Sequence, residues 1–316
     1  MTQKRERRAA PEVPLIAPGD VGLALTEPVH TLFAYTLSDR TNVNILEWLA
    51  TLSTSLRSGK RRKFESVYKA MLGSRIAEMP PARDYVAALI TTLLIQRMTY
   101  SRLARDPKWR PALTVQGADR VQAALDSGAG VVFWTLPQEM TAILLRMVCS
   151  DNDWKMHHLS HWMHGQSVSR LGIATFNRRD CRIEDQLSDR IFMTDATTKE
   201  ALKTAIGIVR TGGCVGFRGI GWSARPTYFP FLEGHAKLAF GAPVVAQRTG
   251  GKLFTAATKI NDGGYELHIE ELSAATKRPL KQIGAEFIAR LERAALDAPA
   301  LWPASSKQWK PGAAGS

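Results

Sequence analysis

The chain has 316 residues, of which 45% are hydrophobic and 22% are charged, as in an ordinary globular protein with one sizeable domain. Its 42 lysines and arginines outnumber 29 aspartates and glutamates, and the formal charge of +13 favours acidic partners such as anionic lipid surfaces, acyl carrier proteins or nucleic acid. The cysteines, Cys149, Cys181 and Cys214, are widely spaced and form no CxxC pair, which argues against a disulfide framework or a zinc site and fits a reducing cytoplasm.

Residues 1–25 are predicted to form a flexible arm, because the opening MTQKRERRAAPEVP is basic and contains scattered prolines. The arm lacks the apolar core of about 7 to 15 residues that a secretory signal peptide needs. The most apolar stretch of the chain, Tyr85 to Ile95, is well short of the roughly 20 residues that span a bilayer. We therefore expect a cytoplasmic protein that is soluble or peripheral to the inner membrane.

Residues 26–112 are predicted to be helical. Two segments, NVNILEWLATLSTSL and DYVAALITTLLIQRMTYSRLA, carry apolar residues at spacings of three and four. The basic run SGKRRKF between them is interpreted either as a solvated loop or helix start, or as a contact for phosphate head groups or a carrier protein.

Residues 113–312 are predicted to form an α/β domain with a mostly parallel sheet flanked by helices. Short β-rich runs alternate there with helical stretches: GVVFWTL, TAILLRMVC, WKMHHLS, GGCVGF, KLFTAAT and YELHIEEL. A ligand of such a sheet is expected beyond the carboxyl ends of the strands. The charge-dense segment 177–195, NRRDCRIEDQLSDRIFMTD, is interpreted as an insertion or a long surface loop.

Several blocks of this domain, taken in order, carry a family resemblance. They are VQGADRVQAALDSGAGVVFWTL, TTKEALKTAIGIVRTGGCVGF, the segment from Tyr228 to Leu272, and LWPASSKQWKP. Their sequence of helices, small-residue turns and strands resembles the lysophospholipid acyltransferase superfamily, specifically its lauroyl/myristoyl lipid A biosynthesis branch. The resemblance implies a glycerolipid acyltransferase-like fold, an acyl-carrier-protein or coenzyme A thioester as donor, and neither a metal nor a further cofactor. Family members usually carry an N-terminal membrane anchor, which this sequence does not show, so an acceptor other than lipid A is expected.

The family's catalytic motif, His-x4-Asp/Glu after the first strand, is altered in this sequence. In the family the histidine takes a proton from the acceptor hydroxyl and the carboxylate orients the imidazole. In WTLPQEMTAIL, Pro137 stands at the histidine position and Ala142 at the carboxylate position, so Pro137 is expected to line the substrate site without acting as a base. The nearest ionisable residue, Glu139, is interpreted as a solvated residue at a helix start, a displaced base, or a residue that holds an acceptor ammonium.

A histidine cluster, KMHHLSHWMHG, contains four of the seven histidines and lies where the family has an acceptor-contacting loop. On a helix, His157, His161 and His164 would share one face, as a metal site requires, but no carboxylate or cysteine is interleaved. The other interpretations are structural histidines, or a replacement acid–base group or acceptor contact. For the latter role His158 and His161 are the preferred pair.

The segment FRGIGWSARPTYFPFLEGH takes the place of the family's third motif. The family has an acidic residue in this motif, whereas this sequence has the basic residues Arg218 and Arg225. They are interpreted as surface charge or as a clamp on a phosphate of the phosphopantetheine arm. Trp222 is a candidate lining residue of an acyl channel. Three further aromatic residues are candidates for the same channel: Tyr228, Phe229 and Phe231. Core packing is expected for at least half of these four residues.

Together these features predict an enzyme that moves an acyl or aminoacyl group from a thioester to an acceptor, most simply an amine. General base catalysis typically contributes about 10² to 10⁴-fold, and a neutral amine is a far better nucleophile toward a thioester than a hydroxyl, so loss of the histidine need not abolish transfer. The alternative is a catalytically silent family member that binds lipid or acylated carrier protein as a partner or scaffold. Nucleic-acid binding is not expected, because only charge favours it.

Overall fold

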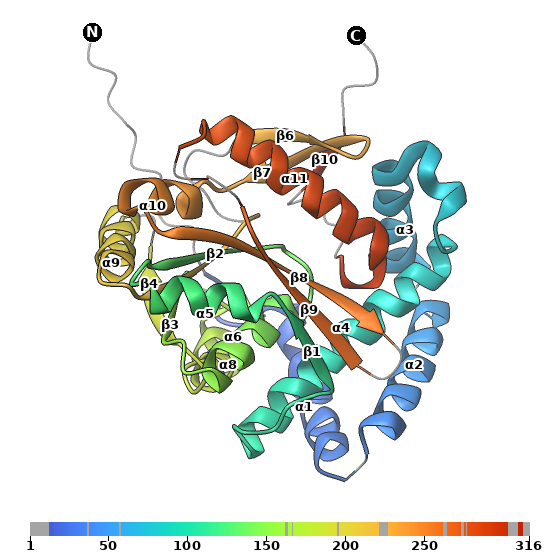
Figure 1. The fold of residues 1–316 in the computed structure, drawn as a ribbon. Coiled ribbons are helices and arrows are strands. Elements are labelled where there is room, and N and C mark those ends of the chain that lie inside the picture. Colours follow the sequence, from blue (N-terminus) through green and yellow to red (C-terminus); the bar gives the residue numbers. More distant parts are fainter. Residues whose placement is uncertain are drawn as a thin grey trace, which may run out of the picture.

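A computed structural model describes residues 13–36, 38–56, 58–161, 164–165, 167–194, 196–220, 227–261, 264–272, 275, 277–302 and 309–311. A twisted central sheet carries helices on both faces, and the N-terminal helices α1 to α4 lie together beside it (Figure 1). This arrangement confirms the predicted α/β class with an N-terminal helical region. None of the helices in the described ranges has the length and apolar character that crossing a bilayer would require.

The N-terminal helices begin earlier than expected. They are α1 (Pro18–Thr36), α2 (Asp39–Leu56), α3 (Ser58–Leu72), the 3-10 helix η1 (Gly73–Glu78) and α4 (Ala82–Arg105). The prediction of a flexible arm is therefore wrong from Pro18 onward. Proline is well suited to the first turn of a helix, and the Asp20 carboxylate accepts a hydrogen bond of 2.7 Å from the Ala17 N–H, so the sequence has a proper helix start there.

The main sheet has seven strands in the order β1-β9-β8-β2-β5-β3-β4. Neighbouring strands run parallel, except that β8 and β9 form an antiparallel pair. The strands are β1 (Leu113–Gln116), β2 (Val131–Thr135), β3 (Met156–His161), β4 (Asp189–Met193), β5 (Cys214–Arg218), β8 (Lys252–Asn261) and β9 (Gly264–Glu271). The predicted, mostly parallel sheet is thus confirmed.

The helices of this domain are α5 (Ala118–Asp126), α6 (Thr141–Asp151), α7 (Arg170–Gly172), the π-helical turn η2 (Ile173–Asn177), α8 (Arg178–Glu184), α9 (Thr198–Arg210), α10 (Gly241–Thr249), α11 (Leu280–Asp297) and the 3-10 turn η3 (Pro299–Leu301). A small antiparallel sheet has the order β10-β7-β6, with β6 (Thr227–Phe231), β7 (Gly234–Leu238) and β10 (Trp309–Pro311).

Two segments differ from their predicted structure. The run TAILLRMVC, grouped with the β-rich runs, forms α6, and it is buried on nearly all sides, so its sequence carries no periodicity that would separate helix from strand. The segment 177–195 is not a surface loop, because it contains α8 and β4. Its charged residues pair with one another and with other elements inside the protein, which a linear sequence does not reveal.

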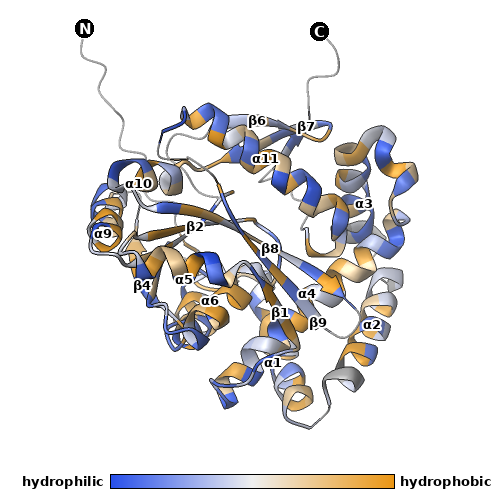
Figure 2. Cartoon of the chain, in the orientation of Figure 1, coloured by the Kyte–Doolittle hydropathy of each residue, from blue (hydrophilic) through white to orange (hydrophobic). Residues whose placement is uncertain are grey.

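The sheet separates two hydrophobic cores, and its central strands are hydrophobic along most of their length (Figure 2). On β2, Trp134 faces the first core and stacks on Phe287 of α11 with ring centroids 3.9 Å apart, whereas Phe133 faces the second. The N-terminal helices share the first core: Tyr68 stacks on Tyr85 at 3.8 Å, and the Tyr85 hydroxyl donates to the Trp302 carbonyl at 2.9 Å.

Candidate functional site

The turn after β2 is held rigidly at the carboxyl edge of the sheet. The buried Gln138 side chain donates to the Thr258 carbonyl at 3.2 Å and accepts from the Thr258 N–H at 3.0 Å. Met140, which is 1% exposed, has a φ of 69°, a left-handed conformation that is costly for a residue with a side chain. Pro137 is itself buried in this turn.

Glu139 is the residue of this turn that is only partly covered. Its backbone N–H donates to the Leu301 carbonyl at 2.7 Å, which fixes its position at the edge of the sheet. Burial raises the pKa of the Glu139 carboxyl, while the charge of Arg218 and a hydrogen bond with Gln96 of α4 lower it. Glu139 is therefore a carboxyl group whose protonation is sensitive to what binds beside it.

Arg218 is the exposed last residue of β5, paired in register with Thr135 at the end of β2. The parallel neighbours β2 and β5 therefore deliver Glu139 and Arg218 to the same edge, where open α/β sheets bind their ligands. An arginine there can bind a phosphate or keep the nearby carboxylate ionised. Of the predicted site residues, the structure brings together Glu139 and Arg218.

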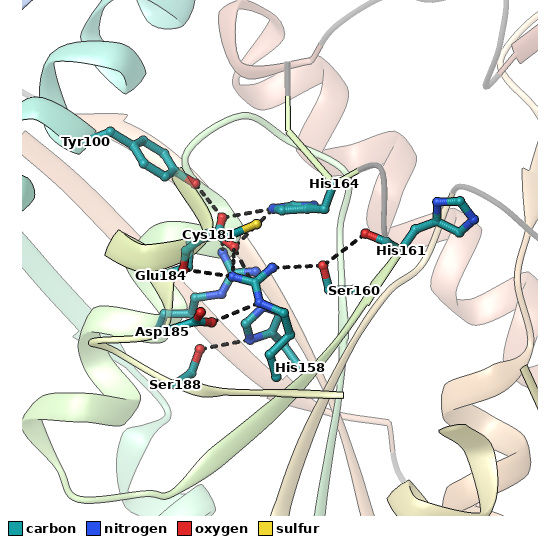
Figure 3. A network of polar contacts seen from close by, with 11 residues as sticks. Tyr100, His158, Ser160, His161, His164, Cys181, Glu184, Asp185 and Ser188 are labelled. Atoms are coloured by element: carbon teal, nitrogen blue, oxygen red, sulfur yellow. Dashed lines mark hydrogen bonds and ion pairs between the residues drawn. The ribbon is translucent and has the colours of Figure 1, made fainter. Parts of the chain in front are cut away.

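The preferred histidine pair is not brought together. His157 to His161 form β3, a strand, so successive side chains alternate between the two faces of the sheet and the helical spacing that a metal site would need does not exist. His158 points into the protein among Ser188 and Glu184, while His161 points away from that cluster (Figure 3). In the described ranges no group of three or more metal-ligating side chains is present.

His158 is unsuited to act as a base. Its side chain is 4% exposed, and its Nδ1 lies 2.9 Å from the Ser188 hydroxyl. Burial, aided by the positive charge of Arg146, lowers the pKa of His158 to about 2. The ring is thus neutral, weakly basic and shielded from a substrate, and a structural role fits these observations.

Glu184, at the end of α8, is the centre of a buried polar network that sequence analysis missed (Figure 3). The carboxylate is 1% exposed and accepts a hydrogen bond of 2.6 Å from the Tyr100 hydroxyl. It also pairs with Arg146 of α6 and Arg190 of β4, each at 3.1 Å. Burial would raise the pKa of Glu184, but the Arg146 charge and a hydrogen bond from His164 hold it well below its usual value.

His164 is the member of the histidine cluster that reaches both this network and solvent. Its Nε2 lies 3.0 Å from Glu184 Oε2, and its side chain is 35% exposed. Because Glu184 is ionised, Nε2 of His164 donates the hydrogen bond to its carboxylate. His164 and Glu184 therefore form a histidine–carboxylate pair of the kind used in acid–base chemistry.

Helix α4 connects the two carboxylates. Gln96 bonds to Glu139 and Tyr100 bonds to Glu184. Residues four apart on a helix have Cβ atoms about 5–6 Å apart on the same face. Both acidic groups therefore meet the same face of α4 within one turn, and we treat Gln96, Tyr100, Glu139, His164, Glu184 and Arg218 together as the carboxyl-edge cluster.

The remaining predicted site residues belong to the segment that takes the place of the family's third motif. Trp222 and Arg225 lie outside the described residues. Phe229 and Phe231 pack in the main core, whereas Tyr228 is 42% exposed beside the Lys310 ammonium. Core packing for at least half of the four aromatic candidates is therefore confirmed.

A shallow hollow of about 210 Å³ lies at the opposite edge of the sheet. Its lining includes Lys155, Met156, Gln186 and Asp189, which stand at or before the amino ends of β3 and β4. Parallel α/β sheets bind ligands at the other edge, so this hollow is not preferred as the functional site.

The sequence signal for the missed residues was available in part. Arg146 interrupts an otherwise apolar run, and a buried arginine requires an acidic partner. The identity of that partner, Glu184, depends on tertiary packing.

Comparison with known proteins does not add to the assignment of this site. No model of a known protein family matches the chain, and no significant match is found among curated proteins.

Proposed function

We propose that this protein is an acyltransferase that moves an acyl or aminoacyl group from a carrier-protein or coenzyme A thioester to an amine. The observation that carries the proposal is the placement of Glu139 within the electrostatic influence of Arg218 at the carboxyl ends of adjacent parallel strands. Glu139 belongs to the turn in which the lipid A acyltransferases, which this sequence resembles, place their catalytic base. A divergent member of that superfamily is the relationship we propose.

In the proposed reaction the neutral amine attacks the thioester carbonyl carbon. A C–N bond forms, the C–S bond breaks, and the amine proton passes to Glu139 and then to the departing thiolate, so that a free thiol and an amide are released. Arg218 binds a phosphate of the donor's phosphopantetheine arm and, by its charge, favours the ionised Glu139 that can accept the proton.

The first test is acceptor-dependent loss of the acyl group from a panel of acyl and aminoacyl carrier proteins, measured by intact mass. We expect transfer to amines but not to simple alcohols. Glu139→Gln is expected to lower the rate about 10²-fold or more. The matched control is Glu78→Gln, which changes an exposed glutamate of η1 and is expected to leave the rate unchanged.

Two further variants separate the roles of the cluster. Arg218→Gln is expected to raise KM for phosphopantetheine donors about tenfold with a smaller effect on kcat, whereas Arg248→Gln, an exposed arginine next to the amino end of β8, leaves both unchanged. If His164→Gln abolishes transfer and Glu139→Gln does not, the base is His164 and the assignment of Glu139 is wrong.

A binding protein without catalysis is the second candidate. It is favoured by Pro137 and Ala142, which leave no ionisable group at the two motif positions. Tight binding of acylated carrier protein, together with unchanged donors in every reaction of the panel, would establish this function and refute the transferase.

A further inference from the structure

Helix α1 has its polar and apolar sides reversed relative to an ordinary surface helix. Its ionisable residues Asp20, Glu27 and His30 all face the protein. Asp20 accepts hydrogen bonds from Ser167 and Ser169, and His30 is 5% exposed. Glu27 pairs with Arg179 of α8 and lies 3.9 Å from Arg97 of α4. Every residue of α1 that the protein leaves exposed is therefore uncharged.

The exposed side of α1 is a continuous apolar stripe. Positions 21, 25, 29, 32 and 35 recur at spacings of three and four, which places them on one helical face. We call this set the outer stripe: Val21, Leu25, Val29, Leu32 and Tyr35. Leu25 is 71% exposed and Leu32 is 58% exposed, so the stripe is not covered by any described part of the chain. Contiguous exposed apolar surface of this kind marks an interaction site.

The apolar surface continues beyond the start of the helix and has basic residues at its ends. Leu15 and Ile16 are also exposed, and the Leu171 N–H donates to the Leu15 carbonyl at 3.0 Å, which places the exposed Leu171 beside them. The exposed Arg170 lies in the same segment. At the other end, the Arg105 guanidinium lies over the Tyr35 ring, 4.9 Å from its centroid.

We propose that the outer stripe of α1 docks on the surface of a membrane that contains anionic lipids. A helix of 19 residues is about 28 Å long and can lie in the interface plane with its apolar side about 5–10 Å deep. Arg105 and Arg170 beside the stripe, and the formal charge of +13, complement an anionic surface.

Other occupants fit the stripe less well. Residues 1–12, MTQKRERRAAPE, contain only one methionine and two alanines as apolar residues, too few to cover the stripe. A second copy of the chain would bring a second formal charge of +13 to the contact, which opposes association.

The test is flotation of the full chain with phosphatidylcholine vesicles that contain either no anionic lipid or about 30% phosphatidylglycerol. We expect binding to the anionic vesicles, weakened by high salt. The double variant Leu25→Gln with Leu32→Gln is expected to weaken binding at least about tenfold. Glutamine and leucine have similar helix propensities, so the variant should retain its fold, which circular dichroism verifies.

Two controls and one second measurement make the result decisive. Ile260→Gln changes another exposed apolar residue, 52% exposed at the end of β8, and is expected to leave binding unchanged. Arg105→Gln with Arg170→Gln should weaken binding to anionic vesicles alone. The proposal is overturned by absence of vesicle binding, by equal binding to neutral vesicles, or by light scattering that shows a stable dimer that the leucine variant abolishes.

Discussion

Glu184 accepts charged and neutral hydrogen bonds from α4, α6 and β4 and lies within hydrogen-bond distance of His164 after β3, and the contribution of this network to stability can be measured. Glu184→Gln keeps the shape of the side chain but leaves the guanidinium groups of Arg146 and Arg190 without their shared buried carboxylate. Removing one member of a buried ion pair typically costs about 3–5 kcal/mol. We expect the free energy of unfolding in urea at pH 7 to fall by this amount. A decrease of less than about 1 kcal/mol would contradict a large contribution of the network to stability.

Asp180, close to this network, should destabilise the protein when ionised. Burial, with a smaller contribution from the negative charge of Glu184, raises the pKa of Asp180 to about 6 from an unfolded value of 3.8, although Arg179 opposes the shift. Between these two values the folded state retains a proton that the unfolded state has lost, so the contribution of Asp180 to stability falls as pH rises and is fully lost above pH 6.

The substitution Asp180→Asn removes this pH dependence. The variant is expected to equal the parent at pH 4 and to be more stable by about 1–3 kcal/mol at pH 7. Urea unfolding of both proteins at the two pH values measures the difference. A variant that is more stable than the parent at pH 4 but not at pH 7 would show that the pH dependence contributed by Asp180 has the opposite sign.

At the scale of single elements, α1 should loosen in acid. His30 is buried on its inner side, and burial, aided by the charge of Arg97, lowers the pKa of His30 to about 4 from 6.5. Between these values the unfolded state binds a proton that the folded state does not, so stability falls as pH decreases from 6.5 to 4. The free energy of unfolding of His30→Leu minus that of the parent is therefore expected to become more positive as pH falls from 7 to 5. A constant difference would contradict this.

The elements themselves were partly predictable. Strands β2, β5 and β8 were recognisable as short apolar runs that follow glycine-containing turns. The run that contains β3 was correctly placed among the β-rich runs, although a helical spacing of its histidines was also considered. The run that forms α6 was ambiguous, because a segment buried on nearly all sides loses the periodicity that distinguishes strand from helix. The start of α1 at Pro18 was missed because its inner face mixes polar with apolar residues while several apolar residues are exposed, unlike the usual pattern.

The candidate site was predictable only in its individual residues. Glu139 and Arg218 were singled out because they lie at or beside motif positions of the family that the sequence resembles, and parallel pairing of β2 and β5 then brings them to one edge. The link from His164 to Glu184, and from both carboxylates to α4, depends on contacts between residues far apart in the chain. Sequence alone gives no information about which charged side chains meet in the interior.

For the molecule as a whole, the N-terminal helices and the sheet should unfold together. Tyr68 and Tyr85 of the helices pack in the same core as Trp134 and Phe217 of the sheet. We therefore expect urea-induced transitions followed by circular dichroism and by tryptophan fluorescence to coincide. Two separated transitions would indicate that the helical region unfolds independently, and the inference that the shared core makes the two regions one cooperative unit would then be wrong.

The hydrogen bond from Tyr85 to Trp302 also constrains when the protein can fold during its synthesis. The two residues are 217 positions apart, and Asp20 is 147 positions from its partner Ser167. At about 5–20 residues per second, a ribosome takes roughly 10 to 40 s to add Trp302 after Tyr85. During that interval α4 emerges without the chain segment that completes its packing. The apolar faces of the N-terminal helices that pack against the C-terminal part of the domain therefore stay uncovered until the last residues of the domain leave the ribosome.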